Sequence, residues 1–224
     1  MSDVVLPAIE IETAANPDAA VVWMHGLGDD GRGWSEVVPA LGLPARLAVR
    51  FVFPHAPMME VTINNGMRMR AWYDIRVADF NDRADLDGVR RSRGQVDALL
   101  GREAARGIAA RRTFLAGFSQ GGAIALYAGV RNEARLGGIV ALSSYLIAAE
   151  RLEGEASAAN RDLPIFMAHG TRDAVIQLAW AERSRDVLKA AGWPVEWHAY
   201  PMEHAAVAEE IAAVGSFIER QLSL

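Results

Sequence analysis

The sequence contains no cysteine among its 224 residues, which excludes disulfides, thiolate metal sites, iron–sulfur clusters and a cysteine nucleophile together. No apolar run approaches the roughly 18 residues of a membrane-spanning helix, so we expect no transmembrane segment. The first residues, from Met1 to Pro7, lack the basic segment and apolar core of a secretory signal peptide. These absences favour a cytoplasmic protein.

The sequence also lacks an excess of basic residues. Lysine and arginine together number 23 against 28 acidic residues, which gives a formal net charge of −5 and argues against nucleic acid as the main partner. Lys189 is the only lysine, a bias that we attribute to genome composition rather than to function. The remaining composition, 51% apolar and 23% charged, is that of a globular protein.

Short apolar runs alternate along the chain with longer segments of helical periodicity. The runs are 20–24, 49–53, 113–116, 138–142, 165–168 and 195–200, and the helical segments are 34–41, 86–105, 121–131, 178–191 and 206–222. Continuous apolar runs favour strands buried on both faces, and their alternation with helices favours a mostly parallel sheet covered on both sides. We therefore predict one α/β domain over residues 1–224, in which the short stretch 143–163 leaves no room for a separate cap domain.

Residues 54–85 break this alternation. They show no helical periodicity, and unstructured connections of this length usually carry function. The stretch is too apolar for disorder, because it contains four methionines together with Trp72 and Tyr73. We expect a flap over a functional site whose Met67, Met69 and Trp72 contact an apolar ligand, since methionine repacks around varied shapes. The alternative is that these side chains fill the core behind the loop.

Residues 117–121 read Gly-Phe-Ser-Gln-Gly, a G-x-S-x-G motif between an apolar run and a helical segment. In that context a sharp strand-to-helix turn exposes the serine hydroxyl. Free N–H groups at the start of the helix point towards any oxyanion that forms there. We therefore interpret Ser119 as a nucleophile, and the alternative is a chance glycine-rich turn.

A nucleophilic serine needs a base, and the base needs an orienting acid. In a sheet of this winding they follow the serine at later strand ends, the acid before the histidine. Asp173 and His204 each come just after an apolar run and are the expected pair. The rivals fit less well, because His198 lies inside a strand, His169 breaks the order and Asp162 precedes its strand.

A second glycine-rich turn, His-Gly-Leu-Gly-Asp at residues 25–29, follows the first apolar run. Such a turn can offer a backbone N–H to the serine site as the second half of an oxyanion hole. Gly26, Gly28 and Gly31 also spell the G-x-G-x-x-G pattern of dinucleotide-binding proteins. That interpretation requires an acidic residue about twenty positions further on, and residues 37–59 contain none.

Four motifs together resemble a known family. They are residues 25–29, residues 61–66 (Val-Thr-Ile-Asn-Asn-Gly), residues 72–75 (Trp-Tyr-Asp-Ile) and residues 117–122, which end in Gly-Gly. Their order and spacing resemble the acyl-protein thioesterases and bacterial carboxylesterases, also called the phospholipase/carboxylesterase family, a small branch of the α/β-hydrolases. The Trp-Tyr-Asp-Ile motif is far more specific than G-x-S-x-G alone.

The resemblance implies an α/β-hydrolase fold with a catalytic triad of Ser119, Asp173 and His204. It also implies an oxyanion hole made by the backbone N–H groups of Leu27 and Gln120. The expected substrate is a small-molecule or acyl ester, and the expected chemistry needs no metal and no cofactor.

Three activities are compatible with these residues. A serine carboxylesterase is the leading hypothesis, and an acyl-protein thioesterase or lysophospholipase would use the same triad. A non-catalytic binding module is disfavoured, because suitable residues fill all three triad positions. An exposed apolar flap would in addition offer a surface for a homodimer. Two features receive no role: the motif at 72–74, and Glu203, which stands before the histidine where many relatives have glycine.

Overall fold

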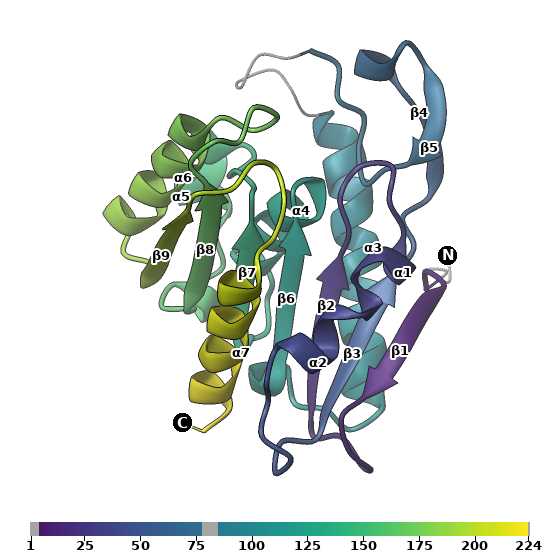
Figure 1. Ribbon diagram of the computed structural model, residues 1–224, viewed down its shortest axis with the longest axis vertical. Coiled ribbons are helices and arrows are strands. Elements are labelled where there is room, and N and C mark those ends of the chain that lie inside the picture. Colours follow the sequence, from purple (N-terminus) through teal and green to yellow (C-terminus); the bar gives the residue numbers. More distant parts are fainter. Residues whose placement is uncertain (1–4, 78–84, 224) are drawn as a thin grey trace.

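The computed structural model describes residues 5–77 and 85–223 and is built around one seven-stranded sheet (Figure 1). The strands are β1 (Ala8–Glu12), β2 (Ala19–Met24), β3 (Val49–Pro54), β6 (Thr113–Phe118), β7 (Gly138–Leu142), β8 (Ile165–Gly170) and β9 (Val195–Tyr200). They lie in the order β1-β3-β2-β6-β7-β8-β9. Only β1 runs antiparallel to its neighbour within this sheet, so the predicted parallel architecture is confirmed.

Helices cover both faces of the sheet. They are α1 (Gly31–Ser35), α2 (Val37–Ala40), α3 (Leu86–Ala105), α4 (Gln120–Gly129), α5 (Leu152–Glu155), α6 (Leu178–Ala190) and α7 (Ala208–Leu222). Alternation along each strand divides the core in two: Val22 of β2 packs towards α3, α4 and α6, whereas Trp23 packs towards α2 and α7. Helix α4 lies behind the central strands and is buried along its whole length.

The predicted helix at 34–41 is two short helices, α1 and α2, in the structure. Pro39 explains the break, because it has no N–H to donate to the carbonyl of Ser35 and so interrupts the helical hydrogen bonds. The other four predicted helices are present, with starting points that differ by no more than two residues from the prediction.

Three strands have no counterpart in the prediction. Strand β1 alternates isoleucine and glutamate, and β4 (Met58–Val61) pairs with β5 (Met67–Arg70) in a separate hairpin within the predicted flap. Alternating strands of this kind are half exposed and escape a search for continuous apolar runs. The remainder of the predicted flap, residues 78–84, lies outside the described residues.

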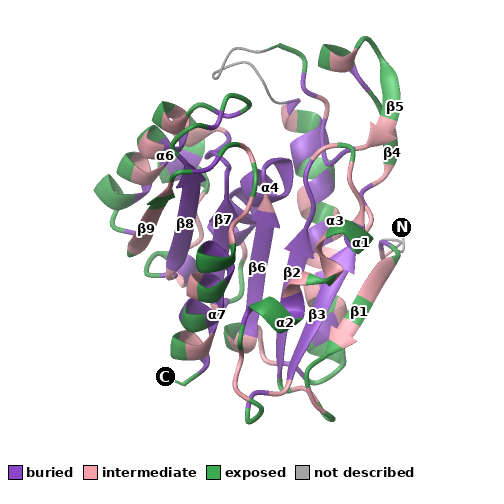
Figure 2. Ribbon diagram, in the orientation of Figure 1, coloured by how far each residue is buried: buried purple, intermediate pink, exposed green. Residues whose placement is uncertain are grey.

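Burial falls off at the edges of the main sheet (Figure 2). Strands β2, β3, β7 and β8 are fully buried, as predicted. The prediction of burial on both faces is wrong for β9, which is half exposed along most of its length. Among the described strands it pairs with β8 alone, at the edge of the sheet. Within the described ranges, no helix combines the length and apolarity needed to cross a membrane.

Candidate active site

Ser119 occupies the sharp turn between β6 and α4. Its backbone has φ 54° and ψ −119°, a left-handed conformation that is strained for any residue with a Cβ. The Ser119 N–H donates to the Leu142 carbonyl at 2.8 Å, which holds the turn against the end of β7. A Cβ at Gly117 would lie 2.3 Å from the Gly121 carbonyl carbon, and a Cβ at Gly121 would lie 2.2 Å from the Met24 oxygen. Only glycine fits at either position.

A continuous hydrogen-bonded chain links Ser119, His204 and Asp173. The Ser119 Oγ lies 2.9 Å from His204 Nε2, and His204 Nδ1 lies 2.6 Å from Asp173 Oδ2. The three side chains come from the loops after β6, β9 and β8, because the carboxyl ends of parallel strands meet at one edge of the sheet.

The Asp173 carboxylate is held on both oxygens. Its Oδ1 accepts the N–H groups of Val175 and Ile176, each at 2.8 Å, while its Oδ2 faces His204. Although burial raises the pKa of Asp173, the hydrogen bonds from His204 and Ile176 outweigh it and leave the pKa below its ordinary value. The group is therefore a fixed anion that orients the histidine ring.

Two of the rival residues lie away from this hydrogen-bonded chain, and the third, His169, lies beside it. His169 is fully buried beside Asp173, and its Nε2 donates to the Ile176 carbonyl at 2.8 Å. Burial lowers the pKa of His169 and favours the neutral ring. His198 stacks on Phe166 with ring centres 4.9 Å apart, and Asp162 is an exposed partner of Arg135. The structure thus brings together the three predicted residues and places His198 and Asp162 apart from them.

Leu27 and Gln120, the predicted oxyanion-hole residues, line the same cavity of about 480 Å³ as Ser119 and His204. Gln120 is the first residue of α4, so its N–H has no partner within the helix. The turn that carries Leu27 packs closely on the serine, since a Cβ at Gly26 would lie 3.5 Å from the Ser119 Cβ. Both residues therefore border the cavity that also holds Ser119.

The rest of this cavity is mostly apolar and aromatic. Its lining includes Trp34, Tyr73, Ile75, Phe118, Tyr145, Val175, Ile176, Ala205 and Ala206. The Phe118 ring centre lies 4.8 Å from the His204 ring centre, so an apolar wall adjoins the histidine. Sequence reasoning missed Tyr145 and Ile176, although each follows the end of a strand, the position that identified Asp173 and His204.

The three predicted substrate contacts fall outside that lining. Of the described residues around the cavity, none is Met67, Met69 or Trp72. Met67 is 64% exposed on the hairpin, whereas Trp72 is buried against His25. A larger cavity of about 960 Å³ lies alongside between α3 and α6 and shares Tyr145 with the first. Across the part of the chain that the structure describes, no cluster of three or more histidine, aspartate or glutamate side chains could hold a metal ion.

Comparisons with known proteins agree with this geometry. Residues 7–222 match a family model described as Phospholipase/Carboxylesterase. The chain is 37% identical to acyl-protein thioesterase 1 of Yarrowia lipolytica, with 96% of this chain and 97% of that protein aligned. It is 38% identical to acyl-protein thioesterase 1 of Neurospora crassa, with coverages of 96% and 92%.

Solved structures give the same answer for the fold. Acyl-protein thioesterase 2 of Zea mays superposes with a TM-score of 0.86 at 29% identity, covering 96% of this chain and 99% of that one. SOBER1 of Arabidopsis thaliana also gives 0.86 at 29% identity, with coverages of 91% and 99%.

Proposed function

Because this chain belongs to the phospholipase/carboxylesterase family and is a serine hydrolase with the α/β-hydrolase fold, we propose that it is an acyl-protein thioesterase. Its catalytic triad is Ser119, His204 and Asp173. The observation that carries the proposal is the hydrogen-bonded chain between these side chains, which ends at a serine hydroxyl inside an apolar cavity.

Acylation begins when His204 Nε2 accepts the proton of the Ser119 hydroxyl as its oxygen attacks the acyl carbonyl. The imidazolium that forms lies 2.6 Å from Asp173, whose negative charge stabilises it. The carbonyl oxygen becomes an oxyanion facing the N–H groups of Leu27 and Gln120. One such donor contributes on the order of 3 kcal/mol to stabilising the transition state.

Collapse of this intermediate expels the leaving group, which takes the proton from His204. Water then enters, gives its proton to the same histidine and attacks the acyl-Ser119 ester. The carboxylic acid leaves and the serine regains its proton. Besides the substrate and this water molecule, each step uses side chains and backbone groups of this chain.

The substrate assignment rests on the relatives and on the cavity. The curated relatives at 37–38% identity are named acyl-protein thioesterases, which favours a thioester over the simple ester of a carboxylesterase. The apolar lining around Phe118 and Ile176 suits an acyl chain. Oxygen esters share the same acyl-enzyme step, so we expect them to react as secondary substrates.

The predicted flap is part of the proposal. The Gly28 N–H donates to the Arg70 carbonyl at 2.9 Å, which joins the hairpin β4–β5 to the turn that carries Leu27. Tyr73 and Ile75, just after the hairpin, line the cavity itself. We therefore place the segment 54–77 beside the bound acyl group.

The test compares S-acyl cysteine peptides with matched O-acyl serine peptides and with lysophosphatidylcholine, using acyl chains from acetyl to palmitoyl. We expect the largest kcat/KM for the thioester peptides. Ser119→Ala should show no hydrolysis of any substrate. Ser216→Ala, an exposed serine on α7, is the matched control and should retain full activity. A preference for short oxygen esters would replace the thioesterase with a carboxylesterase, and activity in Ser119→Ala would overturn the triad.

A further inference from the structure

The segment after β5 carries Trp72 and Tyr73, two residues of the family-like motif that the reaction steps above do not use. Both are buried, and neither side chain reaches the Ser119–His204–Asp173 chain by a described hydrogen bond. Instead, their backbone and the Trp72 indole contact the two elements that hold the oxyanion-hole residues.

One set of contacts leads to Gln120. The Trp72 N–H donates to Gln120 Oε1 at 2.8 Å, and Gln120 Nε2 donates to the Tyr73 carbonyl at 2.7 Å. Only 2% of Gln120 is exposed, so water does not compete for these bonds. These two hydrogen bonds tie Gln120 to the segment at residues 72–73. They thereby fix the position of the residue whose backbone N–H is proposed to face the oxyanion.

A second contact leads to the turn that carries Leu27. The Trp72 indole N–H donates to the His25 carbonyl at 2.9 Å. His25 in turn holds the turn through its ring, because Nδ1 donates to the Gly26 carbonyl at 2.7 Å and Nε2 accepts the Ala56 N–H at 3.1 Å. Burial lowers the pKa of His25, which favours the neutral ring that this pattern requires.

Trp72 is itself anchored to the body of the protein. Its carbonyl accepts a hydrogen bond from the hydroxyl of Ser92 on α3, and the residue is 2% exposed and belongs to the core cluster between α3 and the sheet. A single residue thus connects three separate parts of the chain: the turn after β2, the turn after β6 and helix α3.

We propose that Trp72 and the side chain of Gln120 form a clamp that sets the separation between the Leu27 and Gln120 N–H groups. This inference rests on the proposed function and adds two positioning residues to it. The two donors lie on different loops, and each must come within about 3 Å of the developing oxyanion. The clamp holds those loops in register before substrate binds.

The test uses two variants. Trp72→Phe removes the indole N–H, and Gln120→Met removes both hydrogen bonds of the side-chain amide and keeps the backbone N–H. A displaced N–H donor weakens binding of the transition state more than binding of the substrate. We expect kcat to fall about 10- to 100-fold while KM stays near the wild-type value. Affinity for a trifluoromethyl ketone, which forms an oxyanion on the serine, should fall by a similar factor.

Two substitutions far from the site are matched controls. Trp193 is equally buried, and its indole donates to the Asn160 carbonyl at 2.7 Å. Asn160 is a buried amide that joins two loops as Gln120 does. Trp193→Phe and Asn160→Leu should lower the melting temperature and leave kcat and ketone affinity unchanged.

The outcomes separate the clamp from the proposed function. If either clamp variant melts earlier but retains wild-type kcat and ketone affinity, the clamp is a packing feature and the inference is overturned. If Ser119→Ala remains active, the proposed triad is wrong, whatever the clamp variants show. An inactive Ser119→Ala, with clamp variants selectively impaired in kcat and ketone affinity, supports both.

Discussion

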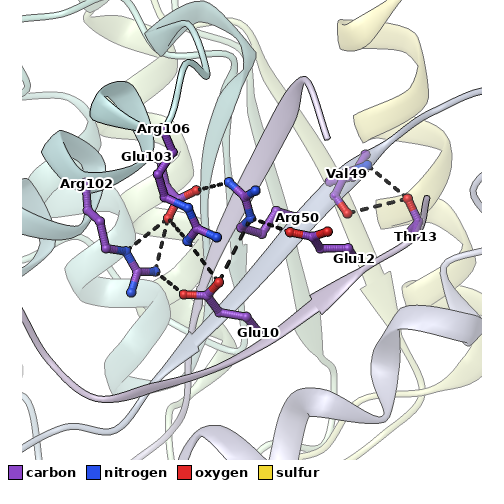
Figure 3. Close-up of polar contacts among 8 residues, drawn as sticks. All are labelled: Glu10, Glu12, Thr13, Val49, Arg50, Arg102, Glu103 and Arg106. Atoms are coloured by element: carbon purple, nitrogen blue, oxygen red, sulfur yellow. Dashed lines mark hydrogen bonds and ion pairs between the residues drawn. The ribbon is translucent and has the colours of Figure 1, made fainter. Parts of the chain in front are cut away.

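Two clusters of polar side chains, each with a buried carboxylate, lie at different edges of the same sheet. One is the chain Ser119–His204–Asp173. The other, which we call the Arg50 cluster, joins strands β1 and β3 to the end of α3 (Figure 3). Its members are Glu10, Glu12, Arg50, Arg102, Glu103 and Arg106.

The Arg50 cluster is a closed network. The carboxylate of Glu103 is fully buried and meets Arg50 at 2.9 Å, Arg102 at 3.0 Å and Arg106 at 3.2 Å. Although burial lowers the pKa of Arg50, its hydrogen bonds to Glu103 and Glu12 raise it above the ordinary value. Each of these charges is neutralised within the network.

The serine site is open by contrast. Asp173 is saturated by two N–H groups and by His204, but the chain ends at a hydroxyl beside a cavity of about 480 Å³. The comparison teaches that buried polar groups stabilise a fold where the network closes, and become available for chemistry where it ends in free space. Substitutions should therefore act on stability at one cluster and on rate at the other.

The largest effect is expected for Asp173→Asn. The amide oxygen can still accept from Val175 and Ile176, but its NH₂ group then faces His204 and favours the wrong tautomer. We expect kcat to fall by roughly 10⁴-fold with little change in melting temperature. The exposed Asp162 gives the control Asp162→Asn, which should match the wild type. A large stability loss in Asp173→Asn without a rate effect would erase the distinction between the two clusters.

Glu103→Gln tests the closed network. Removing this carboxylate leaves the buried Arg50 without its main partner, and breaking a buried ion pair costs about 3–5 kcal/mol. Urea unfolding should show that loss, while the folded fraction keeps its specific activity. Asp18→Asn removes an exposed partner of Arg112 and should cost less than about 1 kcal/mol. Equal effects of the two substitutions would contradict the role of burial.

Glu210 sharpens the comparison, because it is a buried carboxyl with no network. Among the described residues, neither Glu210 oxygen has a partner in hydrogen-bond geometry. Burial raises the pKa of Glu210 to about 8, and the nearby Val207 backbone N–H lowers it only in part. The Glu210 carboxyl ionises near pH 4.5 in the unfolded chain and near pH 8 in the folded protein. Stability from this group is therefore complete below pH 4.5 and is lost as the pH rises to about 8.

Glu210→Gln removes that titration. We expect the variant to gain on the wild type by about 1.4 kcal/mol per pH unit across this window, as followed by urea midpoints at successive pH values. Glu209→Gln, an exposed neighbour on the same turn of α7, should run parallel to the wild type. Parallel curves for Glu210→Gln as well would mean that the carboxyl is ionised in the folded protein.

The smallest effect concerns the backbone of Ser119. Glycine adopts φ 54° without strain, so Ser119→Gly should be more stable than Ser119→Ala by about 1 kcal/mol. Both variants lack the hydroxyl, and thermal unfolding of the two isolates the contribution of the Cβ. At Ser216, on the exposed face of α7, the order should reverse, because glycine is the poorer helix former. The same order at both sites would argue against strain at the turn.

The serine site was predictable because its signals are local. Ser119 lies in a motif with glycine at both required positions, and Asp173 and His204 follow apolar runs that the sequence displays openly. The Arg50 cluster was not predictable, because Glu103 appears as an ordinary polar residue on a helix until β1, more than ninety positions earlier, pairs beside it. Burial of a charge depends on such distant pairings. The same reason hid Tyr145, whose place between two cavities depends on loops from several strands.

Strand β9 forms one of the two edges of the sheet, and the loop that follows it supplies His204. A strand paired on one side separates from its sheet at a lower free-energy cost than a central strand. Local opening at this edge would carry His204 away from Ser119 while β2, β3 and β6 stay folded. Heat inactivation should therefore begin as a reversible loss of alignment, detectable at temperatures below the cooperative melting of the core.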